Sequence, residues 1–177
     1  MEHLEIIEIK SDKVKAYKEF LAIGLRNDEE NFRISPDDDL YSPFPTHDRE
    51  DSFTLGAYCD GHLAGIVSFA RDGHDREKLR HKGILFRMYV SNEYRGMGIA
   101  KKLIESLIDM VRKIDNIEQI NLTVIATNTG AKKLYTQFGF ETFGTEQNAI
   151  KWKGKYFTED QMVLKFTMMN CDTEKND

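Results

Sequence analysis

Apolar residues alternate with polar ones, or form short runs between turn residues, in several parts of the chain, and this pattern predicts β-strands. The segment "SFTLGAYCDGHLAGIVSFARD" (52–72) contains two such runs on either side of Asp60-Gly61. An Asp-Gly pair in this setting is a strong hairpin signal, because both central residues of a type I′ turn need positive φ. We expect strands at 4–10, in the two runs of 52–72, and at 83–91, 120–127 and 161–166.

Other segments repeat their apolar residues at helical spacing. They predict one helix over 11–27, with Ser11 or Asp12 as its N-cap, a second around 103–114, and a third over 128–140 that Gly139 closes. The repeating residues are Val14, Tyr17, Phe20, Leu21 and Leu25 in the first helix and Leu103, Leu107, Met110, Val111 and Ile114 in the second.

The segment 27–51 differs from both patterns. It contains all three prolines of the chain and little periodicity, so we expect a loop with a short helix around 29–34. The predicted order of elements is β-α-(α)-β-β-β-α-β-α-β-β. Of the two final strands, the last is assigned to 161–166, and the one before it has no assigned residues. This order fits a mixed sheet with helices on both faces.

Composition and charge narrow the class of protein. A chain of 177 residues is expected to form one domain, over 1–166, followed by a polar C-terminal tail at 167–177. The net charge of −5 gives no support to nucleic-acid binding, and no apolar run approaches the roughly 20 residues of a membrane span. The first residues do not resemble a signal peptide, so we expect a cytoplasmic protein. Cys59 and Cys171 do not suggest a disulfide framework, and no His, Cys or Asp cluster has metal-ligand spacing.

The stretch "YVSNEYRGMGIAKKL" (89–103) joins a predicted strand to a predicted helix through a turn with two glycines. It is not a dinucleotide fingerprint, because Lys101 stands at the last glycine position, and the chain has no P-loop motif. Backbone N–H groups at a helix start, with the helix dipole and two lysines, suit an anion such as a phosphate. Equally, Gly96 and Gly98 would serve a tight turn without any ligand. The turn alone leaves both interpretations open.

A second motif, "NTGAKKLYTQFGF" (128–140), follows some thirty residues later. Together, R-x-x-G-x-A at Arg95–Ala100 and N-x-x-A-x-x-L-Y-x-x-F-G-F at Asn128–Phe140 resemble the GCN5-related N-acetyltransferase (GNAT) superfamily. The resemblance covers 83–140 by motif and 1–82 by element order. It implies an α/β (α+β mixed) GNAT fold, with a central twisted mixed, mainly antiparallel sheet and helices on both faces.

The resemblance also implies a site for acetyl-CoA as cosubstrate. Its pyrophosphate would lie on the backbone N–H groups of the turn, and its pantetheine arm would pair with the free backbone of the strand at 86–90. Asn128 would contact the arm through its amide, although Asn is also a good N-cap without a ligand. The residues expected to bind acetyl-CoA are Met88, Tyr89, Val90, Arg95, Gly96, Met97, Gly98, Ile99, Ala100, Lys101, Asn128 and Ala131.

The same resemblance implies that the chain would transfer acetyl from acetyl-CoA to a primary amine by direct attack in a ternary complex. Tyr135 would protonate the leaving thiolate, although it also fits the buried stripe of its helix. Many members carry a Glu on the central strand where this chain has Ile84, so the general base stays unassigned. Its candidates are Glu29, Glu30, His47, Asp48 and His74. The alternative function is a non-catalytic acyl-CoA sensor on the same fold.

The acceptor is an amine whose identity the sequence leaves open. The segment 28–51 has nine acidic residues against two arginines. If it lines the cleft, it favours a cationic small-molecule or peptide amine; otherwise these are solvated loop charges. The family often pairs through its C-terminal strands, which favours a homodimer.

Overall fold

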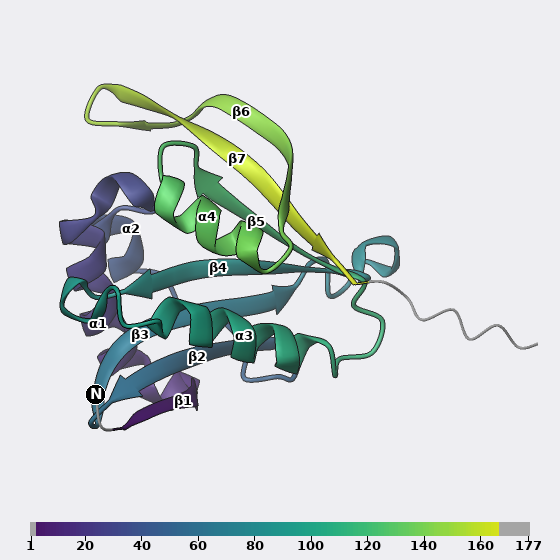
Figure 1. The fold of residues 1–177 in the computed structure, drawn as a ribbon, viewed down its shortest axis with the longest axis horizontal. Coiled ribbons are helices and arrows are strands. Elements are labelled where there is room, and N and C mark those ends of the chain that lie inside the picture. The colour runs from purple at the N-terminus through teal and green to yellow at the C-terminus, as the bar shows by residue number, and fades with distance from the viewer. Residues whose placement is uncertain (1–2, 167–177) are drawn as a thin grey trace, which may run out of the picture.

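The computed structural model describes residues 3–166, which form one seven-stranded sheet with helices on both faces (Figure 1). The strand order is β1-β2-β3-β4-β5-β7-β6, and only β4 and β5 pair in parallel. This confirms the predicted fold class. The strands are β1 (Leu4–Ile9), β2 (Ser52–Cys59), β3 (His62–Arg71), β4 (Lys82–Val90), β5 (Gln119–Ile125), β6 (Glu141–Trp152) and β7 (Lys155–Lys165), and the helices are α1 (Val14–Asn27), α2 (Pro36–Leu40), α3 (Ile99–Val111) and α4 (Thr129–Gln137).

The sheet opens between β4 and β5. Their ladder contains only Lys82–Ile84 opposite Gln119–Asn121, so the remainder of β4 has no β5 partner. On its other side β4 pairs with β3, but the register shifts between Ile66 and Ser68. Arg87 sits in this bulge with a φ of 51°. A bulge bends and twists its strand, and here it coincides with the separation of the two strands.

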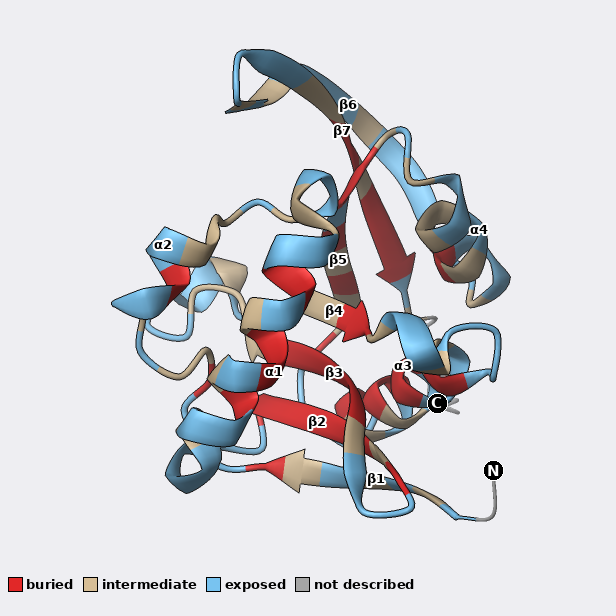
Figure 2. Cartoon of the chain, turned by 90° about the vertical axis from the view of Figure 1, so that its left-hand side faces the viewer, coloured by how far each residue is buried: buried red, intermediate tan, exposed pale blue. Residues whose placement is uncertain are grey.

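Two apolar cores lie on opposite faces of the sheet. The larger core packs α3 and α4 against the sheet, and α3 contributes a fully buried stripe of Leu103, Ile104 and Leu107. The smaller core lies under α1, where Tyr17 and Leu21 pack with Ile66 (Figure 2). Burying one such apolar side chain contributes about 1.5–3 kcal/mol. The buried apolar side chains of α1 and α3 therefore hold these two helices against the sheet.

Several local predictions are confirmed, and others are wrong. Asp60 and Gly61 have φ of 47° and 82° and form the predicted hairpin turn between β2 and β3. The segment 27–51 contains α2, which was not predicted, beside a shorter 3-10 turn at Glu29–Asn31. Pro36 begins α2, and Ser35 caps it in a capping box with Asp38.

The N-cap expected for α1 is also wrong. Ser11 and Asp12 belong to a separate 3-10 turn, and α1 begins at Val14 without a side-chain cap. The Ser11 backbone N–H instead donates to the Asp48 carboxylate, from a loop far along the chain. At the other end of the chain, β6 occupies residues that were not assigned to an element, and β7 begins at Lys155, before the predicted start at 161.

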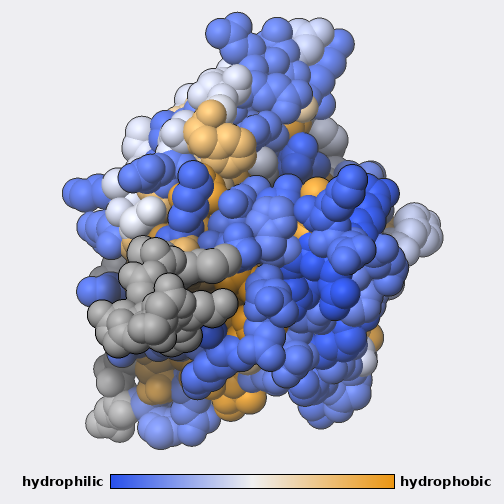
Figure 3. All heavy atoms as spheres, turned by 90° about the vertical axis from the view of Figure 1, so that its right-hand side faces the viewer, coloured by the Kyte–Doolittle hydropathy of each residue, from blue (hydrophilic) through white to orange (hydrophobic). Residues whose placement is uncertain are grey.

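Hydrophilic side chains dominate the face of the molecule seen in Figure 3. None of the described helices has the length and apolar character needed to cross a membrane. Cys171 and the predicted tail at 167–177 lie outside the described residues.

Gly83 tests the packing at the point where β4 and β5 still pair. A Cβ on Gly83 would lie 2.2 Å from two ring carbons of the fully buried Phe69. We therefore expect Gly83→Ala to lower the free energy of unfolding by about 1–3 kcal/mol, the usual cost of overpacking a core. Urea unfolding measures this difference.

Gly130→Ala is the matched control. A Cβ there meets only the Asn128 side chain at 3.9 Å, and Ala is a better helix former than Gly. This variant should be at least as stable as the parent. A Gly83→Ala protein as stable as the parent would contradict the packing described here.

Candidate active site

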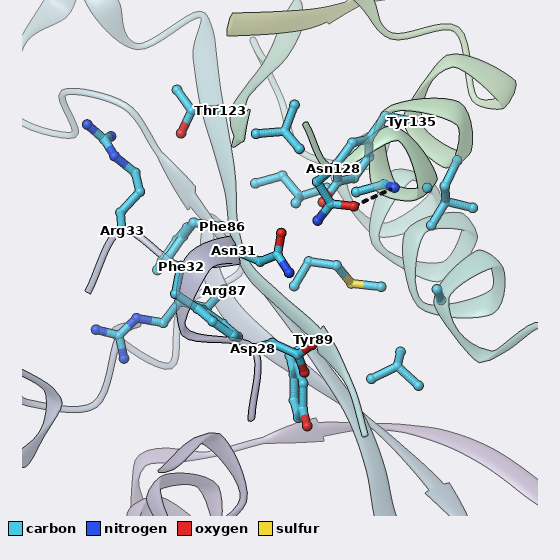
Figure 4. A pocket seen from close by; sticks show the side chains of 18 of the residues that line it. Asp28, Asn31, Phe32, Arg33, Phe86, Arg87, Tyr89, Thr123, Asn128 and Tyr135 are labelled. Atoms are coloured by element: carbon cyan, nitrogen blue, oxygen red, sulfur yellow. Dashed lines mark hydrogen bonds between the residues drawn. The ribbon is translucent and has the colours of Figure 1, made fainter. Parts of the chain in front are cut away.

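A cavity of about 940 Å³ occupies the opening between β4 and β5. Its walls come from the segment after α1, from β4 and β5, from the turn before α3 and from α4 (Figure 4). Thus residues that lie far apart in the sequence meet in one cleft. The cleft has one end at the Gly-rich turn and another end between the segment 31–34 and the middle of β4.

The Gly-rich turn presents backbone donors to the first end of the cleft. Gly96 and Gly98 have φ of 76° and 79°, a region that favours glycine, and Gly98 is the N-cap of α3. No heavy atom lies within 4 Å of a Cβ built on either residue. Glycine is thus favoured at both positions by the positive φ and not by a lack of room, because the space beside each Cα is open. A smaller hollow of about 170 Å³, lined by Gly98, Ala100 and Lys101 among others, continues the cleft here.

The Arg95 side chain holds this turn in place. Its Nη1 and Nη2 donate to Asp28 at the end of α1, at 3.3 and 2.7 Å, and its Nε donates to the Val90 carbonyl at 3.1 Å. The guanidinium also lies 5.9 Å from the centre of the Tyr89 ring. Arg95 therefore braces the turn against α1, and the N–H groups that remain for a ligand belong to the backbone. Those of the first helical turn have no intrahelical partner.

The end of β4 forms the floor of the cleft. Met88 and Val90 direct their side chains to the core beneath α3, whereas Tyr89 packs under α1. Their backbone edge toward β5 is unpaired among the described residues, since the β4–β5 ladder ends at Ile84. Such an edge is a ready partner for an extended chain with amide groups. This is the geometry expected for a pantetheine arm.

Of the remaining residues predicted to contact acetyl-CoA, Ala131 and Asn128 line the cleft from α4, Ile99 has its side chain in the core, and Met97 is 48% exposed. Asn128 is the N-cap of α4, and its Oδ1 accepts from the Ala131 N–H at 3.1 Å. Its amide nitrogen points away from the helix in Figure 4. The capping role is present, and the side chain also reaches the cleft.

Tyr135 lies in the cleft on α4, close to Asn128 (Figure 4). It is 6% exposed and packs edge-on against Phe140, with ring centres 5.7 Å apart. Burial raises the pKa of its phenol well above the usual value. Tyr135 is therefore a neutral hydrogen-bond donor throughout the physiological pH range.

The five residues considered as a general base lie elsewhere. Glu29 and Glu30 pair with Lys153 and Lys155, Asp48 accepts from Ser11, and His74 lies 3.4 Å from Asp51; neither they nor His47 line the cleft. Ile84, at the position where many members carry Glu, lines the cleft with an apolar side chain. Among the described residues that line the cavity, Asp28 carries the only carboxylate, and this carboxylate forms an ion pair with Arg95.

The acid-rich segment 28–51 is largely engaged in internal contacts. Seven of its nine acidic residues bind within the chain: Asp28 with Arg95, Glu29 with Lys153, Glu30 with Lys155, Asp38 with Ser35, Asp39 with Arg87, Asp48 with Ser11, and Asp51 with Arg71. The other two, Asp37 and Glu50, do not line the cavity. The segment therefore offers the cleft no free carboxylate among the described residues. Glu30, Asp37, Asp38 and Glu50 are exposed, as solvated loop charges would be, whereas Asp39 and Asp51 are buried.

The polar residues at the second end of the cleft were not predicted from the sequence. Arg87, in the β4 bulge, and Arg33 both line it, together with Phe32 and Phe86. A charged residue inside the apolar run "GILFRMYV" was the signal available for Arg87. Arg33 had none, because its position depends on a contact with Glu159 far along the chain.

Among the described residues that line the larger cavity there is no cysteine, serine, histidine or lysine. Cys59 is buried in β2, and burial raises the pKa of its thiol, so it is not a nucleophile for this site. Among residues 3–166 there is no group of His, Cys, Asp and Glu able to hold a metal ion.

Comparison with known proteins agrees with this geometry. The model of the acetyltransferase (GNAT) family matches residues 18–140, which is more than half of the chain. The spermine/spermidine N(1)-acetyltransferase of Bacillus subtilis is 28% identical over 91 residues, or 51% of this chain and 60% of that protein. The L-amino acid N-acetyltransferase of Escherichia coli is 29% identical over 62% of this chain and 65% of that protein. The chain thus spans less than two thirds of the length of these relatives.

Solved structures share the fold. A GNAT acetyltransferase from Streptococcus pneumoniae has a TM-score of 0.81 at 24% identity, covering 93% of this chain and all of that one. A GCN5-related N-acetyltransferase from Kribbella flavida has a TM-score of 0.77 at 22% identity, over 92% of this chain and 98% of that one. With the opened sheet, the glycine turn and the matching family model together, this chain belongs to the acetyltransferase (GNAT) family.

Proposed function

We propose that the protein is an acetyl-CoA-dependent N-acetyltransferase that acetylates a primary amine by direct attack in a ternary complex. The observation that carries the proposal is the unpaired edge of β4, which runs from a turn rich in free backbone donors to a buried tyrosine. This arrangement suits a long ligand with a diphosphate at one end and a thioester at the other. Bound acetyl-CoA would supply the activated acetyl group.

The chain's own groups divide the work between them. The backbone N–H groups from Gly96 to Lys101 offer an anion site at the start of α3, and the helix dipole adds to its field. The edge of β4 aligns the arm, and a backbone N–H near Met88 would stabilise the oxyanion of the tetrahedral intermediate. Tyr135 donates its proton toward the sulfur as the C–S bond breaks and regains one from water.

The amine must lose a proton before it attacks, because a primary amine has a pKa near 10 and is mostly charged at neutral pH. No free carboxylate or imidazole lines the cavity within the described residues. Water is therefore the proposed proton acceptor. The same observation favours the alternative of a non-catalytic acyl-CoA sensor, and measured turnover separates the two. A cytoplasmic location and a homodimer stay predictions.

Gly98→Asp tests the anion site. Asp tolerates a left-handed backbone, so the turn should persist, but the new charge would face the diphosphate. Juxtaposed like charges cost several kcal/mol, so we expect the Kd of acetyl-CoA to rise at least about 100-fold. Isothermal titration calorimetry measures it.

Gly98→Asn is the control, since it has the same shape without the charge. It should weaken binding much less than Gly98→Asp does. Equal affinity of the Asp and Asn variants would mean that no anion binds at this turn.

Tyr135→Phe tests the acid. Loss of the phenol should leave the Kd of acetyl-CoA unchanged and lower kcat by about 100-fold, the scale of general acid catalysis. A thiol-release assay measures kcat.

Tyr58→Phe is the control for this variant. Tyr58 also carries a phenol but is half-buried in β2 and does not line the cavity, so removal of its hydroxyl should not change kcat. The parent rate should also not fall from pH 7 to about pH 10, since the raised pKa of Tyr135 keeps it protonated there. An unchanged kcat in Tyr135→Phe would move the acid role to water.

A further inference from the structure

The second end of the cleft combines apolar walls with two arginines. Phe32, Ile34, Ile84 and Phe86 line it, and so do the side chains of Arg33 and Arg87 (Figure 4). Within the described part of the chain, no acidic residue lines this end. An acceptor with several positive charges would therefore meet guanidinium groups rather than carboxylates. The charge of this end suits an acceptor that carries an anionic group beside its amine.

Arg87 is held so that part of its guanidinium stays available. Its Nη1 donates to Asp39 Oδ1 at 2.9 Å and lies 3.5 Å from the Tyr17 hydroxyl. Asp39 and Tyr17 are almost fully buried, so they fix the arginine from behind. The Nε and Nη2 donors have no partner among residues 3–166, and Arg87 lines the cavity with 16% of its side chain exposed. An arginine held in this way can bind a carboxylate by donating two parallel hydrogen bonds to its oxygens.

The bulge in β4 explains why an arginine can occupy this place. Arg87 has a φ of 51°, and the register of β4 against β3 shifts beside it. The bulge places Arg87 between Phe86 and the core residue Met88, with its guanidinium beside Tyr17 of α1 and Asp39 of α2. Bulges commonly redirect a side chain beside an active site.

Arg33 belongs to the opposite wall. Its Nε lies 3.2 Å from Glu159 Oε1, and Glu159 is 2% exposed whereas Arg33 is 61% exposed. Burial raises the pKa of Glu159, and the charge of Arg33 opposes that shift. The acid therefore orients Arg33 but does not itself face the acceptor.

We propose that the acceptor is a primary amine that carries a carboxylate and an apolar side group, as an apolar α-amino acid does, and that Arg87, with Arg33 opposite, binds the carboxylate. This inference rests on the proposed transferase function and names its substrate class. The neutral amine nitrogen forms the new N–C bond in a tetrahedral intermediate, and collapse of this intermediate breaks the C–S bond. The nitrogen gives two protons to water, one before attack and one on collapse. The thiolate receives the proton of Tyr135, and Tyr135 regains one from water.

Matched pairs of acceptors test the inference. L-phenylalanine is compared with phenethylamine, and L-leucine with 3-methylbutylamine, which differ only by the carboxylate; spermidine serves as the polycationic probe. We expect kcat/KM to be at least about tenfold higher for each amino acid, the size of effect that one charge-assisted hydrogen bond gives. Equal or faster acetylation of the decarboxylated amines, or of spermidine, would overturn the inference.

Two arginine variants assign the effect to residues. Arg87→Lys keeps a charge beside Asp39 but removes the planar fork, and Arg33→Gln changes an exposed side chain. Each should raise KM for the amino acids and reduce the preference over the decarboxylated amines, with KM for acetyl-CoA unchanged. Arg49→Gln is the matched control, because Arg49 is also an exposed arginine paired with an aspartate but lies outside the cavity. A preference that survives in both Arg33 and Arg87 variants would contradict the assignment.

Failure of the inference can be told from failure of the proposed function. Acetyl-CoA that stabilises the protein against heat, with turnover of amines but no preference for the carboxylate, would reject the inference alone. If no acceptor reacts, the rise in Tm given by N-acetyl-L-phenylalanine together with CoA is compared with the rise given by N-acetylphenethylamine together with CoA. Equal rises in Tm would reject the inference. No stabilisation by acetyl-CoA rejects the proposed function.

Discussion

The separation of β4 from β5 is the constraint on which the rest of the site depends. The two strands share a parallel ladder only up to Ile84, and beyond it each backbone follows its own direction. Unpaired strand edges are costly when buried and invite pairing when exposed to a ligand. The cavity and the unpaired edge follow from this one departure from a regular sheet, and the bulge at Arg87 coincides with it.

Most charged groups near the cleft form ion pairs within the chain. Three ion pairs join the segment after α1 to the β6–β7 hairpin: Glu29–Lys153, Glu30–Lys155 and Arg33–Glu159. The pairs formed by Glu29 and Glu30 are partly exposed, and such pairs contribute about 0–1 kcal/mol each, whereas the third ends on the buried carboxylate of Glu159. All three hold the segment after α1 against the hairpin. The acidic excess of 28–51, which in the sequence suggested a cationic acceptor, is largely consumed in such contacts.

Local signals in the sequence were enough for much of the fold and for one end of the site. Asp60-Gly61, Gly96 and Gly98 need positive φ, and this need is visible from residue type alone. The motif at 128–140 likewise located Asn128 and Tyr135, which the structure brings to the same cleft as the turn.

Features set by long-range contacts could not be predicted. The pair of Arg87 and Asp39 joins residues 48 positions apart, and the partner of Ser11 is Asp48. α2 was missed because it spans only Pro36–Leu40, too short for periodicity, although Ser35-Pro36 and Asp38 carry the signal of a capped start. The second end of the cleft belongs to this class, since Arg87 and Arg33 take their positions from the buried acids Asp39 and Glu159 on other elements.

The most direct test of the central claim, an acyl-CoA site in the opened sheet, is thermal unfolding with acetyl-CoA, with NAD as the comparator. A ligand at about 100 times its Kd stabilises the native state by about 2.7 kcal/mol, which raises the Tm of a protein of this size by several degrees. A rise with acetyl-CoA and none with NAD is the predicted result. An unchanged Tm with acetyl-CoA at millimolar concentration would contradict the claim.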